Sequence, residues 1–236
     1  MVSVVMAAYN EAATVGCVVA AVVSHPQLCE VIVVDDGSSD ATARRARAAG
    51  ASVIELPANG GKAAALEAGV VRARSEILLF LDADVTGLTH ADISRLIAPV
   101  AAGKVDMHVG LRARRTLWLN RLLHVFPIIG GERAVQRRIW QLVPARHKRG
   151  FRIEVALNYT AKRFGRGMSF ELISGLRHRT KEHKFGWWRG LLRRLHMVGQ
   201  VTAVAFSLYI VAALRDTLAR PRGRQADDRQ TEDRGG

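Results

Sequence analysis

The feature that most constrains the fold is a regular alternation of short apolar runs and longer amphipathic runs over the first hundred residues. Apolar runs rich in β-branched residues occupy residues 2–8, 30–37, 51–56 and 76–84. Helical periodicity covers residues 11–25, 39–50, 60–74 and 92–103. Apolar strands that alternate with amphipathic helices are typical of a parallel sheet covered by helices on both faces. The sequence therefore predicts an α/β fold with a mostly parallel sheet.

The second half of the chain is less regular. Residues 104–112 favour a fifth strand and residues 168–173 a late short strand. Residues 130–142 and 150–165 both have helical periodicity, so we expect a helix in each.

Polar side chains gather where the predicted strands end. Tyr9 and Glu11 follow the first strand, Asp36 follows the second, and Asp82 and Asp84 follow the fourth. In open parallel sheets, ligands bind outside the carboxyl ends of the strands. We therefore expect these side chains to line one ligand site.

The Asp82-Ala83-Asp84 sequence favours a divalent ion. Two carboxylates that close together offer the hard oxygen ligands that Mg²⁺ and Mn²⁺ prefer. A helix cap or a turn is the alternative explanation for such a pair. Asp36 also has two explanations. Its carboxylate could accept a hydrogen bond from a base or a ribose, or the segment could be structural, since residues 38–40 suit a turn that caps the next helix.

The residues that open the third predicted helix suit an anion. Gly60 and Gly61 permit close approach of the backbone, and Lys62 supplies a positive charge. The segment is not a P-loop, because alanine follows Lys62 and the glycine spacing differs.

The chain resembles the family 2 glycosyltransferases of GT-A fold, in which a Rossmann-like sheet binds the nucleotide. The resemblance is carried by four segments in the family's order: AAYNEAATV, VIVVDDGSSDAT, NGGKAAALEAG and ILLFLDAD. It continues through VGLRARR, GGERAVQRRIW, GFRIEVALNYTAKRFG and RHRTKEHKFG, which are similar to segments of the polyprenyl-phosphate (dolichol-phosphate) type.

This resemblance implies a role for each residue of the site. Asp84 would bind a divalent metal, Mg²⁺ or Mn²⁺, that bridges the two phosphates of a nucleoside diphosphate sugar, and Asp82 would contact the ribose or the metal. Lys62 would lie on the same donor side. The residues expected around the nucleoside are Ala8, Tyr9, Glu11 and Asp36.

The acceptor determines which further groups are needed. A hydroxyl acceptor requires a carboxylate base, whereas the oxygen of a lipid phosphate is already ionised and requires cations that position it. Pro127 stands where the similar polyprenyl-phosphate enzymes commonly have an Asp. Glu132 and Glu154 are therefore the remaining candidate bases. For each of them, a structural salt bridge is the alternative. The expected phosphate-holding cations are Arg112, Arg133 and Lys184, with a solvated basic face as the alternative.

Charge and hydropathy indicate an anionic partner and a membrane. The net charge is +14, and the basic residues are concentrated in the middle of the chain. Residues 197–214 contain no charged side chain, and Trp187 and Trp188 precede them among basic residues. Such a segment could span a bilayer, lie flat on it, or complete a soluble core. No aromatic platform alternates with the basic residues, so we do not expect nucleic acid as a partner.

These observations predict three regions. Residues 1–190 would form the GT-A domain, with a nucleotide-sugar half (1–103) and a basic acceptor half (104–190). Residues 191–216 would form a helical, membrane-associating segment, and residues 217–236 a disordered tail. No signal peptide is evident before the first strand, so we expect the enzyme at the cytoplasmic face of the cell membrane.

The predicted function is metal-dependent transfer of a sugar, with inversion, from a nucleotide sugar to a polyprenyl phosphate. One alternative is a retaining transferase with a soluble phosphorylated acceptor, similar to glucosyl-3-phosphoglycerate synthases. The other is a basic binding module without catalytic activity.

Overall fold

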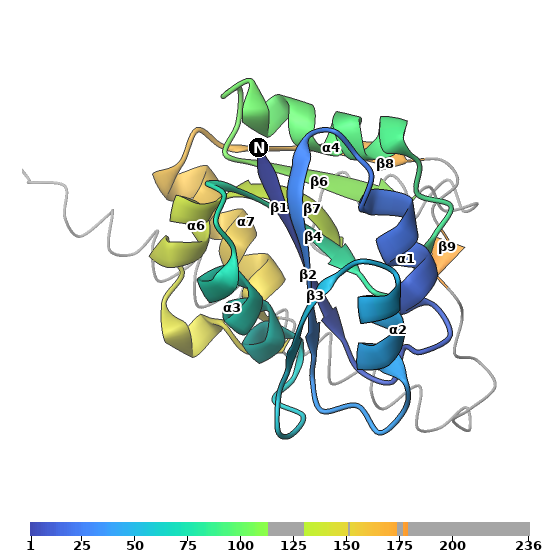
Figure 1. Ribbon diagram of the computed structural model, residues 1–236. Helices are drawn as coiled ribbons and strands as arrows, with labels where there is room; N and C mark the ends of the chain where they lie inside the picture. Colours follow the sequence, from blue (N-terminus) through green and yellow to red (C-terminus); the bar gives the residue numbers. More distant parts are fainter. Residues whose placement is uncertain (113–129, 151, 174–176, 179–236) are drawn as a thin grey trace, which may run out of the picture.

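The computed structural model describes residues 1–112, 130–150, 152–173 and 177–178. Its centre is a seven-stranded sheet in the order β3-β2-β1-β4-β7-β6-β8 (Figure 1). The strands are β1 (Val2–Ala8), β2 (Leu28–Asp35), β3 (Ser52–Glu55), β4 (Ile77–Asp82), β6 (Met107–Arg112), β7 (Glu132–Gln136) and β8 (Met168–Ile173). Two short strands, β5 (Val85–Thr86) and β9 (Arg177–His178), pair separately. β7 pairs antiparallel with both of its neighbours, and the other pairs in the large sheet are parallel, so the predicted mostly parallel sheet is confirmed.

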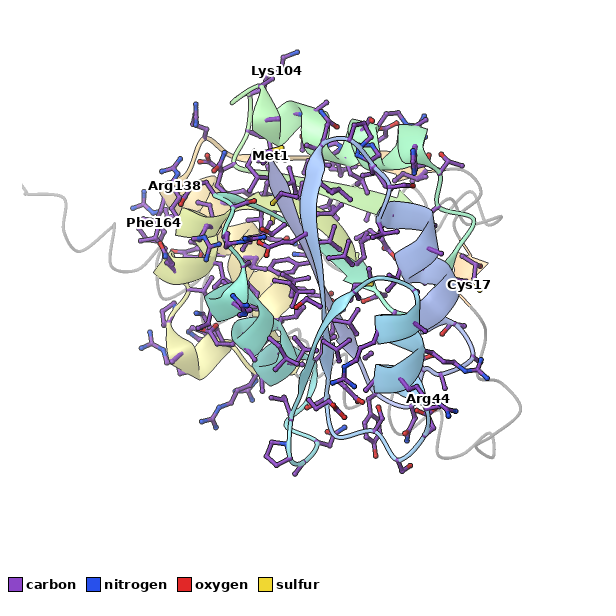
Figure 2. All side chains as sticks on the ribbon, viewed as in Figure 1. Met1, Cys17, Arg44, Lys104, Arg138 and Phe164 are labelled. Atoms are coloured by element: carbon purple, nitrogen blue, oxygen red, sulfur yellow. The ribbon has the colours of Figure 1, made fainter. Side chains whose placement is uncertain are left out.

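Helices cover both faces of the sheet (Figure 1). One face carries α1 (Val15–Val22), α2 (Thr42–Ala48) and α4 (His90–Ala101). The other carries α3 (Lys62–Arg72), α6 (Arg137–Leu142) and α7 (Arg152–Phe164), with a short 3-10 helix, η1 (Ala145–His147), before α7. Figure 2 shows the two layers through their outer side chains: Cys17 and Arg44 lie on one flank, and Arg138 and Phe164 on the opposite flank.

Alternation along the strands explains why both layers are needed. Val4 and Met6 of β1 pack against the α1 and α4 layer, whereas Val5 packs against the α3 layer. All three side chains are fully buried. A strand that is apolar on both faces is stable only when both faces are covered.

The helix predicted over residues 130–142 is wrong in its first half. Residues Glu132–Gln136 form strand β7, and only Arg137–Leu142 is helical. β7 lies between β4 and β6, where its backbone has hydrogen-bonding partners on both sides. This tertiary context outweighs the local helical periodicity.

The other predicted helices and strands agree more closely with the structure. The helix expected over residues 150–165 and the strand over 168–173 are found as Arg152–Phe164 and Met168–Ile173. The first helix is shorter than expected, because residues 11–14 form a turn in which the Glu11 carbonyl accepts the N–H groups of Thr14 and Val15.

Several predictions concern residues outside those described. They include Lys184, the membrane-associating segment 191–216 and the tail 217–236. Within the part of the chain that the structure describes, no helix is both long enough and apolar enough to cross a bilayer.

Candidate active site

Register places the ends of three strands beside one another. Ala7 of β1 pairs with Asp82 of β4, and Ala8 pairs with Asp35 of β2. The residues that follow these strands therefore leave the sheet along one edge. In Figure 2, Met1 and Lys104 mark the opposite edge.

A cavity of about 510 Å³ opens at this carboxyl edge. Its lining includes seven of the predicted site residues: Ala8, Tyr9, Glu11, Asp36, Lys62, Asp82 and Asp84. The remaining lining residues are Ala7, Asn59, Gly61 and Ala83. The expected gathering of polar side chains is therefore present, while the role of each residue stays a prediction.

Two loops that carry the nucleoside-side residues are tied together. Asn10 has a left-handed backbone with φ 55°, which asparagine tolerates better than most residues. Its side-chain oxygen accepts the Ser39 N–H at 2.9 Å, and its own N–H donates to Ser38 Oγ at 2.9 Å. The Glu11 N–H donates to Thr42 Oγ1 at 2.9 Å. These bonds fix the loop on which Tyr9, which is 46% exposed, presents its ring.

Asp36 fixes the start of α3. Its two carboxylate oxygens accept the N–H groups of Gly60 and Gly61, each at 2.8 Å. Both N–H groups precede the first turn of α3, where no carbonyl within the helix can accept them. Asp36 thus has a structural role that the sequence did not reveal, in addition to its predicted contact with the nucleoside.

Lys62 is shared between two carboxylates. Its ammonium donates to Asp82 Oδ1 at 2.8 Å and to Glu154 Oε1 at 3.2 Å. Burial alone would lower the pKa of Lys62, but the nearby charges of Asp82 and Glu154 outweigh burial and raise the pKa above its usual value. Lys62 therefore stays charged at the base of the cavity.

Arg133 is buried and is not among the residues that line the cavity. Its guanidinium donates to the Gly130 carbonyl, to Asn158 Oδ1 at 3.3 Å and to the Glu154 carbonyl at 3.5 Å. The residue is only 2% exposed, and burial lowers its pKa, although the charge of Glu154 opposes this effect. The expected phosphate-holding role of Arg133 is therefore not supported, because its donors are used inside the protein.

Glu154 is likewise held from two sides. One carboxylate oxygen accepts from Lys62, and the other lies 3.9 Å from Arg133 Nη2. Its side chain is 7% exposed and does not line the cavity. This geometry favours the salt-bridge alternative for Glu154 over a catalytic base.

The carboxylates of the cavity suit a divalent ion that is shared with a substrate. Within the described ranges, no group of three or more His, Cys, Asp or Glu side chains is arranged to hold an ion. Mg²⁺, however, is commonly bound by one or two carboxylates together with substrate phosphates and water. Asp82 and Asp84 supply that number, and the amino-terminal end of α3 beside them favours negative charge.

Two site features were missed by sequence reasoning. Asn59 lines the cavity from the loop before α3. Gly131 lies against Asp82, so that a Cβ at this position would overlap the carboxylate. The only available signal was the Gly130-Gly131 pair, which suggests close approach of the backbone. Arg112 ends β6, and its side chain is outside the described part of the structure.

A sequence model described as "Glycosyl transferase family 2" matches residues 3–158. The chain belongs to glycosyl transferase family 2. The match includes every residue that lines the cavity.

Two curated relatives of this family-2 chain are named for different products. The chain is 35% identical to a dodecaprenyl-phosphate galacturonate synthase of Rhizobium johnstonii over 123 residues. The alignment covers 48% of this chain and 36% of the relative. The chain is 30% identical to a glucosyl-3-phosphoglycerate synthase of Mycobacterium tuberculosis over 144 residues. This alignment covers 57% of this chain and 44% of the relative. The matched region is thus less than half the length of either relative.

Solved structures confirm the predicted GT-A fold. Glucosyl-3-phosphoglycerate synthase from M. tuberculosis in complex with Mg²⁺ and UDP superposes with a TM-score of 0.73 at 25% identity, covering 88% of this chain and 78% of that one. The same enzyme in complex with Mn²⁺, UDP-glucose and glycerol 3-phosphate has a TM-score of 0.72 at 25% identity, covering 88% and 79%.

Proposed function

We propose that this protein transfers a glycosyl group from a nucleoside diphosphate sugar to a polyprenyl phosphate, with Mg²⁺ or Mn²⁺ as cofactor. The observation that carries the proposal is the cavity at the carboxyl edge, in which Asp82, Asp84 and Lys62 lie beside the start of α3. Two carboxylates suit a metal, and the lysine and the helix start suit a diphosphate.

The proposed reaction is a displacement at the anomeric carbon of the donor sugar. A bound divalent ion would neutralise the charge that develops on the nucleoside diphosphate as it leaves. Asp84 and Asp82 would hold that ion, and Lys62 would face the diphosphate. The loop that carries Tyr9 and Glu11 would enclose the nucleoside.

A phosphate acceptor is favoured because neither candidate base lines the cavity. Glu132 is only 3% exposed, and Glu154 is paired with Lys62 and Arg133. An ionised phosphate oxygen needs no base to attack the anomeric carbon. The lipid form of this acceptor is supported by the similarity to dodecaprenyl-phosphate galacturonate synthase and by the uncharged segment 197–214. We place the enzyme at the cytoplasmic face of a membrane and expect inversion at the anomeric carbon.

A soluble phosphorylated acceptor, with retention, is the second candidate. It is favoured by the superposition on a synthase that holds Mn²⁺, UDP-glucose and glycerol 3-phosphate. Lys184 and Arg112, which we predicted to hold the acceptor phosphate, would serve either acceptor.

The test is a product assay with the full chain. Purified protein is incubated with Mn²⁺ and a panel of nucleotide sugars, with either undecaprenyl phosphate or 3-phosphoglycerate. A glycolipid from the first acceptor supports the main proposal, and a product only from 3-phosphoglycerate, undiminished by deletion of residues 195–236, supports the second. No product from any pair would contradict both.

A further inference from the structure

A chain of alternating charges runs from the cavity into the core. Lys62 Nζ lies 2.8 Å from Asp82 Oδ1 and 3.2 Å from Glu154 Oε1, and Glu154 Oε2 lies 3.9 Å from Arg133 Nη2. The side chains of Lys62 and Asp82 are 35% and 25% exposed, but those of Glu154 and Arg133 are only 7% and 3% exposed. One end of the chain is therefore open to ligands, and the other end is enclosed.

The enclosed end is fixed in place. The Arg133 guanidinium donates to the Gly130 carbonyl and to Asn158 Oδ1, which together hold it in position. Glu154 is on the first turn of α7 and faces this guanidinium. Lys62, with a long side chain at the start of α3, is the member that can change position.

A metal ion at Asp82 creates an electrostatic conflict with Lys62. Like charges held within a few ångströms of each other repel even in surroundings typical of a protein surface. Lys62 already donates to Asp82, so an incoming cation competes with the ammonium for the same carboxylate. Glu154 is a second carboxylate within reach of Lys62 that does not face the cavity.

We propose that Glu154 is a positioning residue, which retains Lys62 when a divalent ion binds at Asp82 and Asp84 and so keeps the ammonium directed at the diphosphate. The inference rests on the proposed function, because it assumes a metal and a diphosphate in this cavity. It gives Glu154 a role different from that of a base: Glu154 acts through Lys62 and never touches the substrate.

The proposal predicts effects of opposite sign on metal affinity. Lys62→Met removes the competing charge, so Mn²⁺ binds more tightly in the absence of nucleotide. Among the described residues, Glu154→Gln leaves Lys62 with Asp82 as its only carboxylate partner, so Mn²⁺ binds about tenfold more weakly. In the Lys62→Met background the same Glu154→Gln change has a much smaller effect, because no ammonium remains to be retained.

The experiment is a titration of the full chain with Mn²⁺ alone, in which electron paramagnetic resonance measures free Mn²⁺. It includes wild type, Lys62→Met, Glu154→Gln and the double variant. Glu67→Gln is the matched control. Glu67 lies further along α3 and pairs with Lys148 at 2.8 Å, so this variant also removes one carboxylate from a lysine pair. Circular dichroism and thermal melting check that each variant is folded. If Glu154→Gln does not fold, the increased affinity expected for Lys62→Met, which leaves the Arg133 and Glu154 pair intact, still tests the proposal.

Two results would overturn the inference while leaving the proposed function standing. One is Mn²⁺ affinity in Lys62→Met that is equal to or weaker than that of wild type. The other is the same loss from Glu154→Gln in both backgrounds, which would mean that Glu154 does not act through Lys62. A wild-type protein that binds no Mn²⁺ even with UDP or GDP present would instead overturn the proposed function itself.

Discussion

Gly131 lies opposite Asp82, and the carboxylate occupies the space that any larger residue at position 131 would need. Phe80 of β4 pairs with Arg133 of β7, and continuing this antiparallel register sets Asp82 across from Gly131. A Cβ on Gly131 would overlap the Asp82 carboxylate. The position of a predicted metal ligand thus depends on a glycine 49 positions further along the chain.

Gly131→Ala is therefore expected to displace Asp82 and to slow transfer from the nucleotide-sugar donor. A shift of about 1 Å in a positioned group can lower the rate by about a hundredfold, and we expect a loss of kcat/KM of this order. Steady-state kinetics with the donor identified by the product assay measures it. Gly16→Ala is the control, because within the described ranges its new methyl group would meet only the Arg45 carbonyl, at 3.7 Å. Unchanged kcat/KM in a folded Gly131→Ala variant would show that Asp82 does not depend on this contact.

Asp36→Ala should destabilise the fold. It removes the acceptors of the Gly60 and Gly61 N–H groups, both at 2.8 Å, in a residue that is 3% exposed. We expect the free energy of unfolding to fall by about 2–3 kcal/mol, since hydrogen bonds to charged groups contribute more than neutral ones.

Urea denaturation of Asp36→Ala and Asp36→Asn measures this effect. Asparagine keeps one acceptor oxygen, so its loss should lie between wild type and alanine. If alanine is as stable as wild type, Asp36 does not hold the start of α3.

Asp106 should make stability depend on pH. Burial opposes its charged form, but hydrogen bonds from Arg138 and from the Arg166 N–H (2.6 Å) outweigh burial and hold the pKa of Asp106 below its usual value. A lowered pKa in the folded state stabilises the fold above the unfolded pKa, about 4, and this stability is lost as pH falls below that value.

Asp106→Asn removes this contribution. At pH 7 we expect the variant to be less stable than wild type by about 1–3 kcal/mol, and the difference should shrink as the pH falls toward about 3. Urea denaturation of both proteins at several pH values measures the difference. A difference that is constant over this pH range would contradict the account.

The donor half of the site could be predicted because its residues are local to their strands. Each of these residues ends a strand or follows one within two positions, and parallel strands bring such positions to one edge: Ala8, Tyr9, Asp36, Asp82 and Asp84. Identifying the strands was therefore enough to bring these residues together. The family resemblance added their expected roles.

The basic half could not be predicted in the same way, because its contacts link distant positions. The sequence predicts that Arg133 is an exposed cation. In the core, however, Glu154 of α7 compensates its charge and Asn158 of α7 accepts a hydrogen bond from it. The same contacts allow β7 to carry a buried arginine in the middle of a sheet. Local periodicity contains no information about such partners and predicts a helix where strand β7 forms.

The central claim is that carboxylates at the carboxyl edge of the sheet hold a divalent ion and, through it, a nucleoside diphosphate. The most direct measurement is the melting temperature of wild type and Asp84→Ala with UDP or GDP, in Mn²⁺ and again with EDTA. A ligand at about 100 times its Kd adds about 2.7 kcal/mol to stability, which is a readily measured shift. We predict that one of these nucleotides raises the melting temperature of wild type only with Mn²⁺, and leaves Asp84→Ala unchanged. A rise that persists in EDTA, or that is equal in Asp84→Ala, would contradict the claim.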